Sequence, residues 1–189
     1  MLLINRYQDN NDIIEIGVDE VGRGPMFGRV YCAAVILPKD ADKFEHKLMK
    51  DSKKFTSEKK LLATANYIKE NCIAYRVGYM DESVIDNVNI KNATHKAMHY
   101  AIKKIIKYSD DNLLLIDGSN FSSITYLSGN IIKEVPTVCI EGGDNKYSSI
   151  AAASIIAKVE RDKYIYELCD QYPKLDELYD LRKNKGYGT

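Results

Sequence analysis

The sequence has no segment that would place the protein in a membrane or mark it for export. Its most apolar run, Cys32–Leu37, is far shorter than the roughly 20 residues that a membrane-spanning helix needs. The first residues, Met1–Gln8, lack the apolar stretch of a signal peptide. We therefore expect a soluble cytoplasmic protein with no membrane association.

Cysteine is scarce and scattered. The four cysteines form no C-x-x-C pair, so the sequence indicates neither a zinc knuckle nor a disulfide framework: they are Cys32, Cys72, Cys139 and Cys169. Free cysteines are usually buried in protein cores. We expect all four to be reduced core thiols.

An excess of positive charge is also missing. Lys and Arg total 27, and Asp and Glu total 27, which by itself argues mildly against a nucleic-acid partner. The charge is uneven, however, because lysines crowd one stretch: Lys43, Lys47, Lys50, Lys53, Lys54, Lys59 and Lys60. This stretch is either a local track for phosphates or a solvated helix face, and composition leaves both open.

What the sequence does contain is a regular alternation of strand and helix patterns. Runs of β-branched and small apolar residues predict five strands, at Ile13–Val18, Gly28–Leu37, Cys72–Tyr79, Leu113–Ile116 and Thr137–Ile140. No repeat or long linker divides them. The order predicts a single α/β domain over residues 1–189, with a mixed central sheet flanked by helices.

Helices are predicted between these strands. Apolar positions at a 3.6-residue period predict a helix over Asn89–Lys107. Ser148 and Ser149 are suited to cap a helix over Ile150–Asp162, whose small residues permit a close approach to a sheet. A shorter helix is expected near Tyr164–Leu181, interrupted at its proline.

Acidic residues appear where three of the predicted strands end. Asp19 and Glu20 close the first strand, Asp117 closes the fourth, and Asp144 follows the fifth. Ligand sites in open α/β sheets lie outside strand ends, so these acids are placed to converge there. Converging carboxylates repel one another unless a cation joins them, and oxygen ligands without His or Cys suit Mg²⁺ or Mn²⁺. Each acid taken singly also has an ordinary explanation as a turn or cap residue.

Such a site matches the chemistry of phosphodiester cleavage. Two ions about 3.5–4 Å apart can activate a water molecule and stabilise the departing oxygen. Immediately after the acid pair, Gly22, Arg23 and Gly24 offer backbone N–H groups and a guanidinium for a phosphate or a sugar hydroxyl, although a simple turn explains them too. His95 and His99 stand four apart but lack a metal-binding context, so we expect a solvated pair.

A long motif makes the interpretation more specific. Gly17-Val18-Asp19-Glu20-Val21-Gly22-Arg23-Gly24-Pro25 resembles the opening signature of the type 2 ribonuclease H family. The resemblance covers nearly the whole chain, continuing through Asp51-Ser52-Lys53-Lys54, Asn89-Ile90, Ala93-Thr94, Ala97-Met98, Asp117-Gly118, Gly143-Asp144, Ser149 to Arg161-Asp162, and Asn184 to Thr189.

The resemblance implies a ribonuclease H-like fold and an endonuclease that hydrolyses the RNA strand of RNA/DNA hybrids. It also implies incision on the 5′ side of a single ribonucleotide in duplex DNA, leaving 5′-phosphate and 3′-hydroxyl ends. By position, Asp19, Glu20, Asp117 and Asp144 look like the family's catalytic ligands for two Mg²⁺ or Mn²⁺ ions.

Further site residues follow from the same resemblance. Gly22, Arg23 and Gly24 match the loop that senses the ribose 2′-hydroxyl, the group that distinguishes RNA from DNA. Tyr187 matches the tyrosine that stacks on a sugar at the RNA–DNA junction, and Lys53 matches a lysine near substrate phosphates. Asp162 is an alternative metal ligand.

The chain departs from the family pattern in two places. Phe27 and Arg29 stand where smaller or prolyl residues are usual, and the chain stops at Thr189, where relatives usually continue into further helix. We expect a monomeric catalytic domain without that C-terminal helical extension. The rival interpretations are another nuclease of the same fold and a non-catalytic nucleic-acid binding module.

Overall fold

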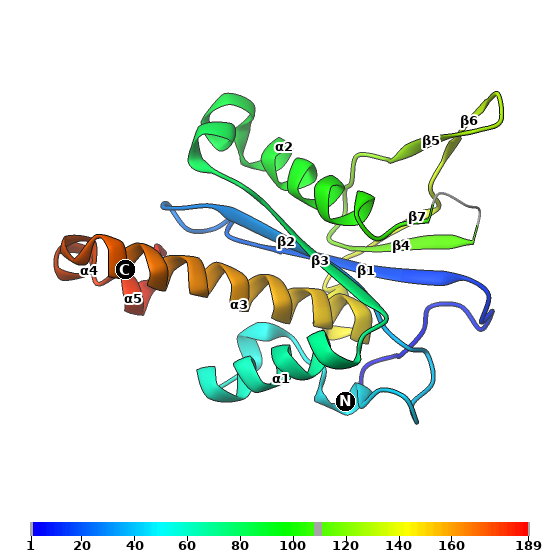
Figure 1. Ribbon diagram of the computed structural model, residues 1–189, viewed down its shortest axis with the longest axis horizontal. Coiled ribbons are helices and arrows are strands. Elements are labelled where there is room, and N and C mark those ends of the chain that lie inside the picture. The colour runs from blue at the N-terminus through cyan, green and yellow to red at the C-terminus, as the bar shows by residue number, and fades with distance from the viewer. Residues whose placement is uncertain (1, 108–110, 189) are drawn as a thin grey trace.

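The structure is a computed structural model that describes residues 2–107 and 111–188. This part of the chain forms a mixed sheet with the strand order β3-β2-β1-β4-β7 (Figure 1). β1 pairs antiparallel with β2 and parallel with β4. The outer strand pairs are antiparallel β2–β3 and parallel β4–β7. The bounds are β1 Ile14–Val21, β2 Val30–Ile36, β3 Ala74–Met80, β4 Asn112–Asp117 and β7 Thr137–Ile140.

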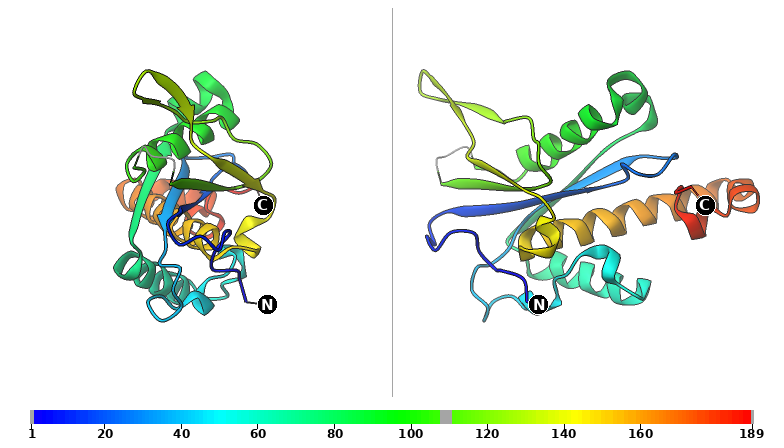
Figure 2. Two further views of the ribbon diagram at one scale, coloured as in Figure 1. Left: turned by 90° about the vertical axis from the view of Figure 1, so that its right-hand side faces the viewer. Right: turned by 180° about the vertical axis from the view of Figure 1, so that it is seen from behind.

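Helices cover both faces of this sheet, as predicted. α2 (Glu82–Lys103) lies on one face (Figures 1 and 2). The opposite face is covered by α1 (Glu58–Asn71) and α3 (Ser148–Gln171). Alternate residues of β2 supply the two cores, because successive strand side chains point to opposite faces. Cys32 and Ala34 join the core under α2, whereas Ala33 and Val35 join the core under α1 and α3.

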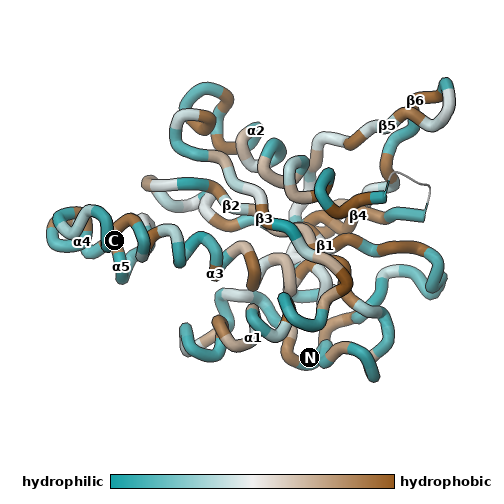
Figure 3. The backbone as a smooth tube through the Cα atoms, viewed as in Figure 1, coloured by the Kyte–Doolittle hydropathy of each residue, from teal (hydrophilic) through white to brown (hydrophobic). Residues whose placement is uncertain are grey.

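The first half of α3 lies tight against β1. A Cβ added at Gly17 would stand 2.2 Å from the backbone carbon of Ser149, so only glycine fits there. The helix surface at this contact consists of small side chains, among them Ala151, Ala152 and Ala153, all fully buried. The first half of α3 is correspondingly hydrophobic and its second half more hydrophilic (Figure 3). The predicted close approach of helix and sheet is confirmed.

Element boundaries differ from the sequence prediction in instructive ways. Thr137–Ile140 is confirmed as β7. β1 is longer than predicted and ends at Val21, because its pairing with β2 continues through Val21 and Tyr31. Asp19 and Glu20 therefore lie inside the strand and project to opposite faces of the sheet.

α2 begins seven residues earlier than predicted and ends at Lys103 rather than Lys107. Its first cap is Asp81, whose side chain accepts a hydrogen bond from the backbone N–H of Val84. Asn89 interrupts it with a left-handed φ of 67°, and its side chain accepts from Asn92 N at 3.0 Å. The predicted start at Asn89 therefore corresponds to a real restart inside a longer helix.

α3 continues through Gln171, so the prediction of a separate helix from Tyr164 is wrong. The break falls at the predicted proline, which opens the next helix; the last two helices are α4 Pro173–Tyr179 and α5 Leu181–Asn184. The predicted serine cap of α3 is also wrong. Tyr147 occupies the cap position, and the Ser148 hydroxyl donates to the carbonyl oxygen of Ile4 at 3.1 Å.

The structure also contains elements that the sequence did not predict. One is the hairpin of β5 Thr125–Ser128 and β6 Ile131–Glu134, which projects at the end of the molecule opposite α4 (Figures 1 and 2). Another is a parallel bridge between Ile4 and Tyr147, where Ile4 N donates to Lys146 O at 2.8 Å. In the described ranges, no helix is long and apolar enough to cross a membrane.

The cysteine prediction is only partly right. Cys32 and Cys169 are buried and Cys72 is half-buried, whereas Cys139 is exposed. Cys139 lies on β7, an edge strand of the sheet. All four thiols are free.

Candidate active site

Four carboxylates gather where the parallel strands end. Val18 of β1 pairs with Ile116 of β4, so Asp19 and Asp117 follow on neighbouring strands. Asp117 in turn pairs with Ile140, the last residue of β7. Three residues after Ile140, a 3-10 turn begins at Gly143 and carries Asp144. We call Asp19, Glu20, Asp117 and Asp144 the carboxylate edge.

Each of these carboxylates is held by a different donor. Asp19 accepts from the backbone N–H of Glu20 at 2.7 Å and also hydrogen-bonds Ser154 on α3. Glu20 accepts from Arg23 Nη1 at 3.2 Å. Asp117 accepts from the backbone N–H of Gly143 at 2.6 Å. Asp144 accepts from the side-chain amide of Asn145 at 3.0 Å. Each of the four carboxylates is thus oriented by its own hydrogen-bond donor.

Burial and mutual repulsion make the carboxylate edge costly to keep charged. Burial raises the pKa of Asp19 well above its ordinary range, and the nearby Glu20 and Asp117 raise it further. Burial also raises the pKa of Glu20, against the opposing effect of Arg23. The pKa of Asp144 is raised by burial and then by repulsion from Asp51 and Asp117. Buried like charges of this kind favour a nearby cation.

The donor set fits a hard divalent cation, because it consists of carboxylate oxygens without thiol or imidazole. As the side chains stand, no group of three or more His, Cys, Asp and Glu residues in the described part of the chain is arranged to hold a metal ion. The hydrogen bonds with the distances given above each engage one oxygen of a carboxylate. A carboxylate held in this way can bind a cation through its other oxygen.

A second turn brings the predicted lysine pair to Asp144. Lys53 and Lys54 lie in the 3-10 turn Ser52–Lys54, which begins after Asp51. Lys54 Nζ donates to the side chain of Asn145, whose amide nitrogen donates to Asp51 at 3.3 Å. The positive charge of Lys53 acts to lower the pKa of Asp144, against the effect of burial. Sequence reasoning missed Asn145, which connects the two turns.

The glycine loop and the C-terminal tyrosine meet at one corner beside Glu20. A Cβ added at Gly24 would stand 3.3 Å from Cε1 of Tyr187, so ring and loop are in contact. Gly22 has a φ of +106°, a conformation that favours glycine. The Arg23 and Tyr187 side chains remain accessible to solvent. We call Gly22–Gly24 and Tyr187 the glycine–tyrosine corner.

Comparison with known proteins decides the family. The sequence model of a family described as Ribonuclease HII matches residues 16–189. Ribonuclease HII of Bacteroides thetaiotaomicron is 43% identical over 180 residues, which are 95% of this chain and 81% of that protein. Ribonuclease HII of Porphyromonas gingivalis is 40% identical over 186 residues, or 98% and 83%. The chain belongs to the ribonuclease HII family.

Solved structures confirm the ribonuclease H-like fold. Ribonuclease H2 of Pyrococcus horikoshii superposes with a TM-score of 0.72 at 21% identity, covering 94% of this chain and 82% of that one. A ribonuclease HIII solved in complex with Mn²⁺ gives a TM-score of 0.60 at 20% identity, covering 85% and 55%. As a ribonuclease HII, the chain is a metal-dependent endoribonuclease that acts on RNA/DNA hybrids and embedded ribonucleotides.

The prediction of a solvated histidine pair is wrong for His95, which is buried, whereas His99 is half-buried. His95 is 9% exposed, and its Nδ1 shares a hydrogen bond of 2.8 Å with the Ser122 hydroxyl. His99 Nε2 donates to the carbonyl oxygen of Ser122 at 2.6 Å. Phe121 packs against both rings. The pair therefore fastens the segment that follows Asp117 to α2.

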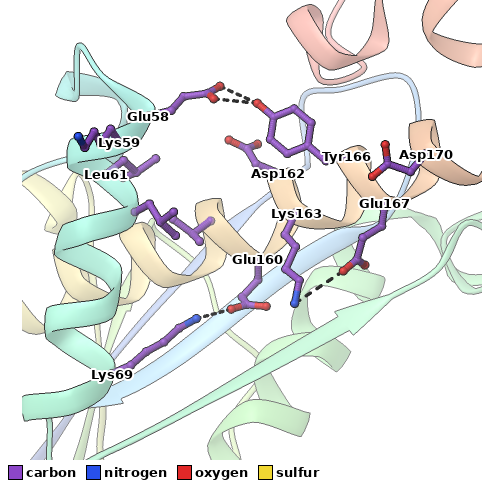
Figure 4. A pocket seen from close by; sticks show the side chains of 12 residues that line it. Glu58, Lys59, Leu61, Lys69, Glu160, Asp162, Lys163, Tyr166, Glu167 and Asp170 are labelled. Atoms are coloured by element: carbon purple, nitrogen blue, oxygen red, sulfur yellow. Dashed lines mark hydrogen bonds and ion pairs between the residues drawn. The ribbon is translucent and has the colours of Figure 1, made fainter. Parts of the chain in front are cut away.

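The alternative ligand Asp162 does not join the carboxylate edge. Its side chain accepts a hydrogen bond from Lys158 at 2.7 Å and lines a groove of about 740 Å³ between α1 and α3 (Figure 4). A smaller cavity of about 240 Å³ is the one lined by Glu20, Arg23 and Asp117. The groove between α1 and α3 is thus separate from the carboxylate edge.

Phe27 and Arg29, the two residues that depart from the family pattern, lie next to the glycine–tyrosine corner. Phe27 packs against Gly186, where a Cβ would stand 3.0 Å from the Phe27 carbonyl oxygen. The Arg29 guanidinium lies between two aromatic rings, 4.7 Å from the centre of Tyr79 and 4.5 Å from that of Tyr164. The larger side chains are accommodated without displacing the glycine loop.

Proposed function

We propose that Asp19, Glu20, Asp117 and Asp144 hold the divalent cations of this ribonuclease HII, two Mg²⁺ or Mn²⁺ ions during catalysis. The observation that carries the proposal is their convergence, from three separate chain segments, into one cluster in which burial and repulsion between carboxylates raise the pKa values of Asp19, Glu20 and Asp144. When bound, such ions activate water and stabilise the departing oxygen. The products are then 5′-phosphate and 3′-hydroxyl ends.

The protein's own residues orient these ligands. Ser154 and the backbone N–H of Glu20 position Asp19, and Gly143 N positions Asp117. Arg23 neutralises part of the charge of Glu20. We propose that this network sets which carboxylate oxygens face the ions.

Substrate recognition is proposed for the neighbouring loops. The backbone of Gly22, Arg23 and Gly24 contacts the ribose 2′-hydroxyl, Tyr187 stacks on the sugar at the RNA–DNA junction, and Lys53 contacts a phosphate. Their support is position: Gly24 touches Tyr187, and Lys53 is close enough to influence the pKa of Asp144. One chain supplies all these groups, so we propose a monomer with residues 1–189 as a single catalytic domain acting on an RNA/DNA hybrid or a ribonucleotide-containing duplex.

A cleavage assay tests the proposal. Two DNA duplexes of identical sequence, one with a single ribonucleotide, are incubated with Mg²⁺ or Mn²⁺ and resolved on a denaturing gel. We expect cleavage of the ribonucleotide duplex alone, on the 5′ side of the ribonucleotide. Cleavage of both duplexes would point to a general nuclease, and metal-independent binding without product would point to a binding module.

The metal ligands are tested separately by thermal melting. We expect Mg²⁺ or Mn²⁺ to raise the melting temperature of the wild-type protein, because a ligand that binds only the folded state stabilises it. The matched variant is Asp19→Asn, which keeps the size of the side chain and should lose most of the shift. An undiminished shift in this variant would remove Asp19 from the site.

A further inference from the structure

The largest fully buried side chain among the residues that the structure describes is a charged one. Arg161 on α3 is 0% exposed, and burial lowers its pKa. Arginine is almost never buried unless its hydrogen-bonding groups are satisfied. Here they are satisfied by three backbone carbonyls: Nη2 donates to Phe27 O at 3.1 Å, Nε to Arg29 O at 3.3 Å and Nη1 to Lys185 O at 3.0 Å.

Two of these carbonyls belong to the segment that continues the glycine loop. Phe27 and Arg29 stand three and five residues after Gly24. At the loop's other end, a Cβ on Gly22 would stand 2.8 Å from Nε of Arg161. The guanidinium therefore packs against Gly22 at the start of the loop and against the segment that follows the loop.

The third carbonyl belongs to the turn that carries Tyr187. Lys185 has a left-handed φ of 55°, and the next residue, Gly186, accepts a hydrogen bond from Met26 N at 3.0 Å. The Arg161 guanidinium carbon lies 5.8 Å from the centre of the Tyr187 ring. The same arginine thus touches both halves of the glycine–tyrosine corner.

The Tyr187 turn has a second anchor on its other side. Lys185 Nζ donates to the Tyr166 hydroxyl at 2.6 Å, and that hydroxyl donates to the Glu58 carboxylate at 2.8 Å (Figure 4). This anchor reaches α1 but makes no contact with the glycine loop. The carbonyl contacts of Arg161 instead join the segment after the loop and the Tyr187 turn through one side chain, next to the direct hydrogen bond from Met26 N to Gly186 O.

We propose that Arg161 is a positioning residue that fixes the spacing between the Gly22–Gly24 loop and Tyr187, and so determines how strongly the enzyme favours a ribonucleotide next to a deoxyribonucleotide. The proposal rests on the proposed function, in which the loop reads the ribose and the tyrosine reads the adjoining sugar. A single embedded ribonucleotide requires both contacts at once. A continuous hybrid offers ribose at every position and depends less on the spacing.

The test compares kcat/KM on two substrates, a duplex with one ribonucleotide and a uniform RNA/DNA hybrid. In Arg161→Gln, at a temperature where melting shows the variant folded, we expect kcat/KM for the single-ribonucleotide duplex to fall about tenfold more than for the hybrid, because small misplacements of binding groups are costly. Arg76→Gln is the matched control, since Arg76 is an exposed arginine on β3 that donates to the carbonyl oxygen of the neighbouring Tyr75. It should change neither value.

Coupling to Tyr187 separates positioning from general stability. In a Tyr187→Ala background, Arg161→Gln should change the substrate ratio little further, because the group it positions is gone. Equal losses on both substrates, or fully additive effects with Tyr187→Ala, would overturn the proposal. Should Arg161→Gln fail to fold, Arg161→Lys decides the question, since lysine keeps the positive charge but cannot reach three carbonyls with three separate nitrogens. An unchanged substrate ratio in a folded Arg161→Lys would overturn the proposal.

Failure of this inference is distinguishable from failure of the proposed function. If the wild-type protein cuts only the ribonucleotide duplex and the Arg161 variants keep its substrate ratio, the inference alone fails. If the wild-type protein shows no ribonucleotide requirement, the proposed function fails before Arg161 is tested.

Discussion

The carboxylate edge and the glycine–tyrosine corner serve one substrate but are held by different kinds of structure. Three of the edge's acids lie on the adjacent parallel strands β1 and β4, where the register of Val18 with Ile116 places Asp19 beside Asp117 through backbone hydrogen bonds. The corner consists of two loops more than 160 residues apart in sequence, joined through the side chain of Arg161. Chemistry is therefore built into the sheet, and substrate choice depends on side-chain contacts.

This difference predicts separate consequences of mutation. A mutation in the carboxylate edge should abolish cleavage of every substrate, so that no substrate preference can be measured. A change at the corner leaves cleavage intact and alters which substrate is cut. Three predictions test the contrast, beginning with the largest effect.

Asp117→Asn should lower kcat by about a thousandfold or more, in the range seen when a group that stabilises transition-state charge is removed. The amide oxygen still accepts from Gly143 N, so the fold should persist. Tyr187→Ala should cost only about tenfold in kcat/KM, the scale of one lost stacking contact. Steady-state kinetics on the single-ribonucleotide duplex measure both, and similar losses in the two variants would break the comparison.

Gly17→Ala and Gly24→Ala compare the same change in the two regions. At Gly17 the new Cβ would collide with the Ser149 backbone at 2.2 Å, so we expect a loss of about 3 kcal/mol in the free energy of unfolding. At Gly24 it would meet the Tyr187 ring at 3.3 Å, which can tilt away. Urea denaturation should show nearly wild-type stability for Gly24→Ala, together with a weaker preference for the single ribonucleotide. A destabilised Gly24→Ala would mean that the corner is as rigid as the sheet.

The smallest effect concerns pH. Burial and repulsion raise the pKa of Asp19 in the folded protein, so folding favours its protonated form. The stability that this protonation contributes is fully present below the unfolded pKa of about 3.9 and is lost as pH rises through the folded pKa. Asp19→Asn should therefore melt a few degrees above the wild-type protein at neutral pH, without divalent cations, and the difference should shrink toward pH 4. A variant that melts lower at neutral pH would contradict this sign.

Much of the edge was predictable from sequence because local patterns encode it. Asp19, Asp117 and Asp144 follow hydrophobic strand patterns, and parallel strands bring such ends together. The full length of β1 was not predictable, since it depends on pairing with Tyr31 on another strand. Whether the four acids bind metal stays a prediction until it is measured.

The supports of the corner were hidden from sequence reasoning. Arg161 stands among charged residues on a helix and looks solvated, yet it is buried because two distant loops cover it. His95 was misjudged for a similar reason, since Ser122 and Phe121 arrive from a segment without a helix or strand pattern. The hairpin of β5 and β6 was missed because it exposes Leu127 and Ile132 rather than burying an alternating face.

The bridge between Ile4 and Tyr147 has a consequence for synthesis of the protein. Ile4 accepts from Ser148 N and donates to Lys146, next to the turn that carries Asp144. Contacts this distant in sequence form slowly, because the intervening chain must first be ordered. During translation the Ile4–Tyr147 bridge cannot form until Tyr147 has left the ribosome. The hydrogen bond from Arg161 to Lys185 forms later still. The nascent chain is therefore expected to remain without nuclease activity until Lys185 has also emerged.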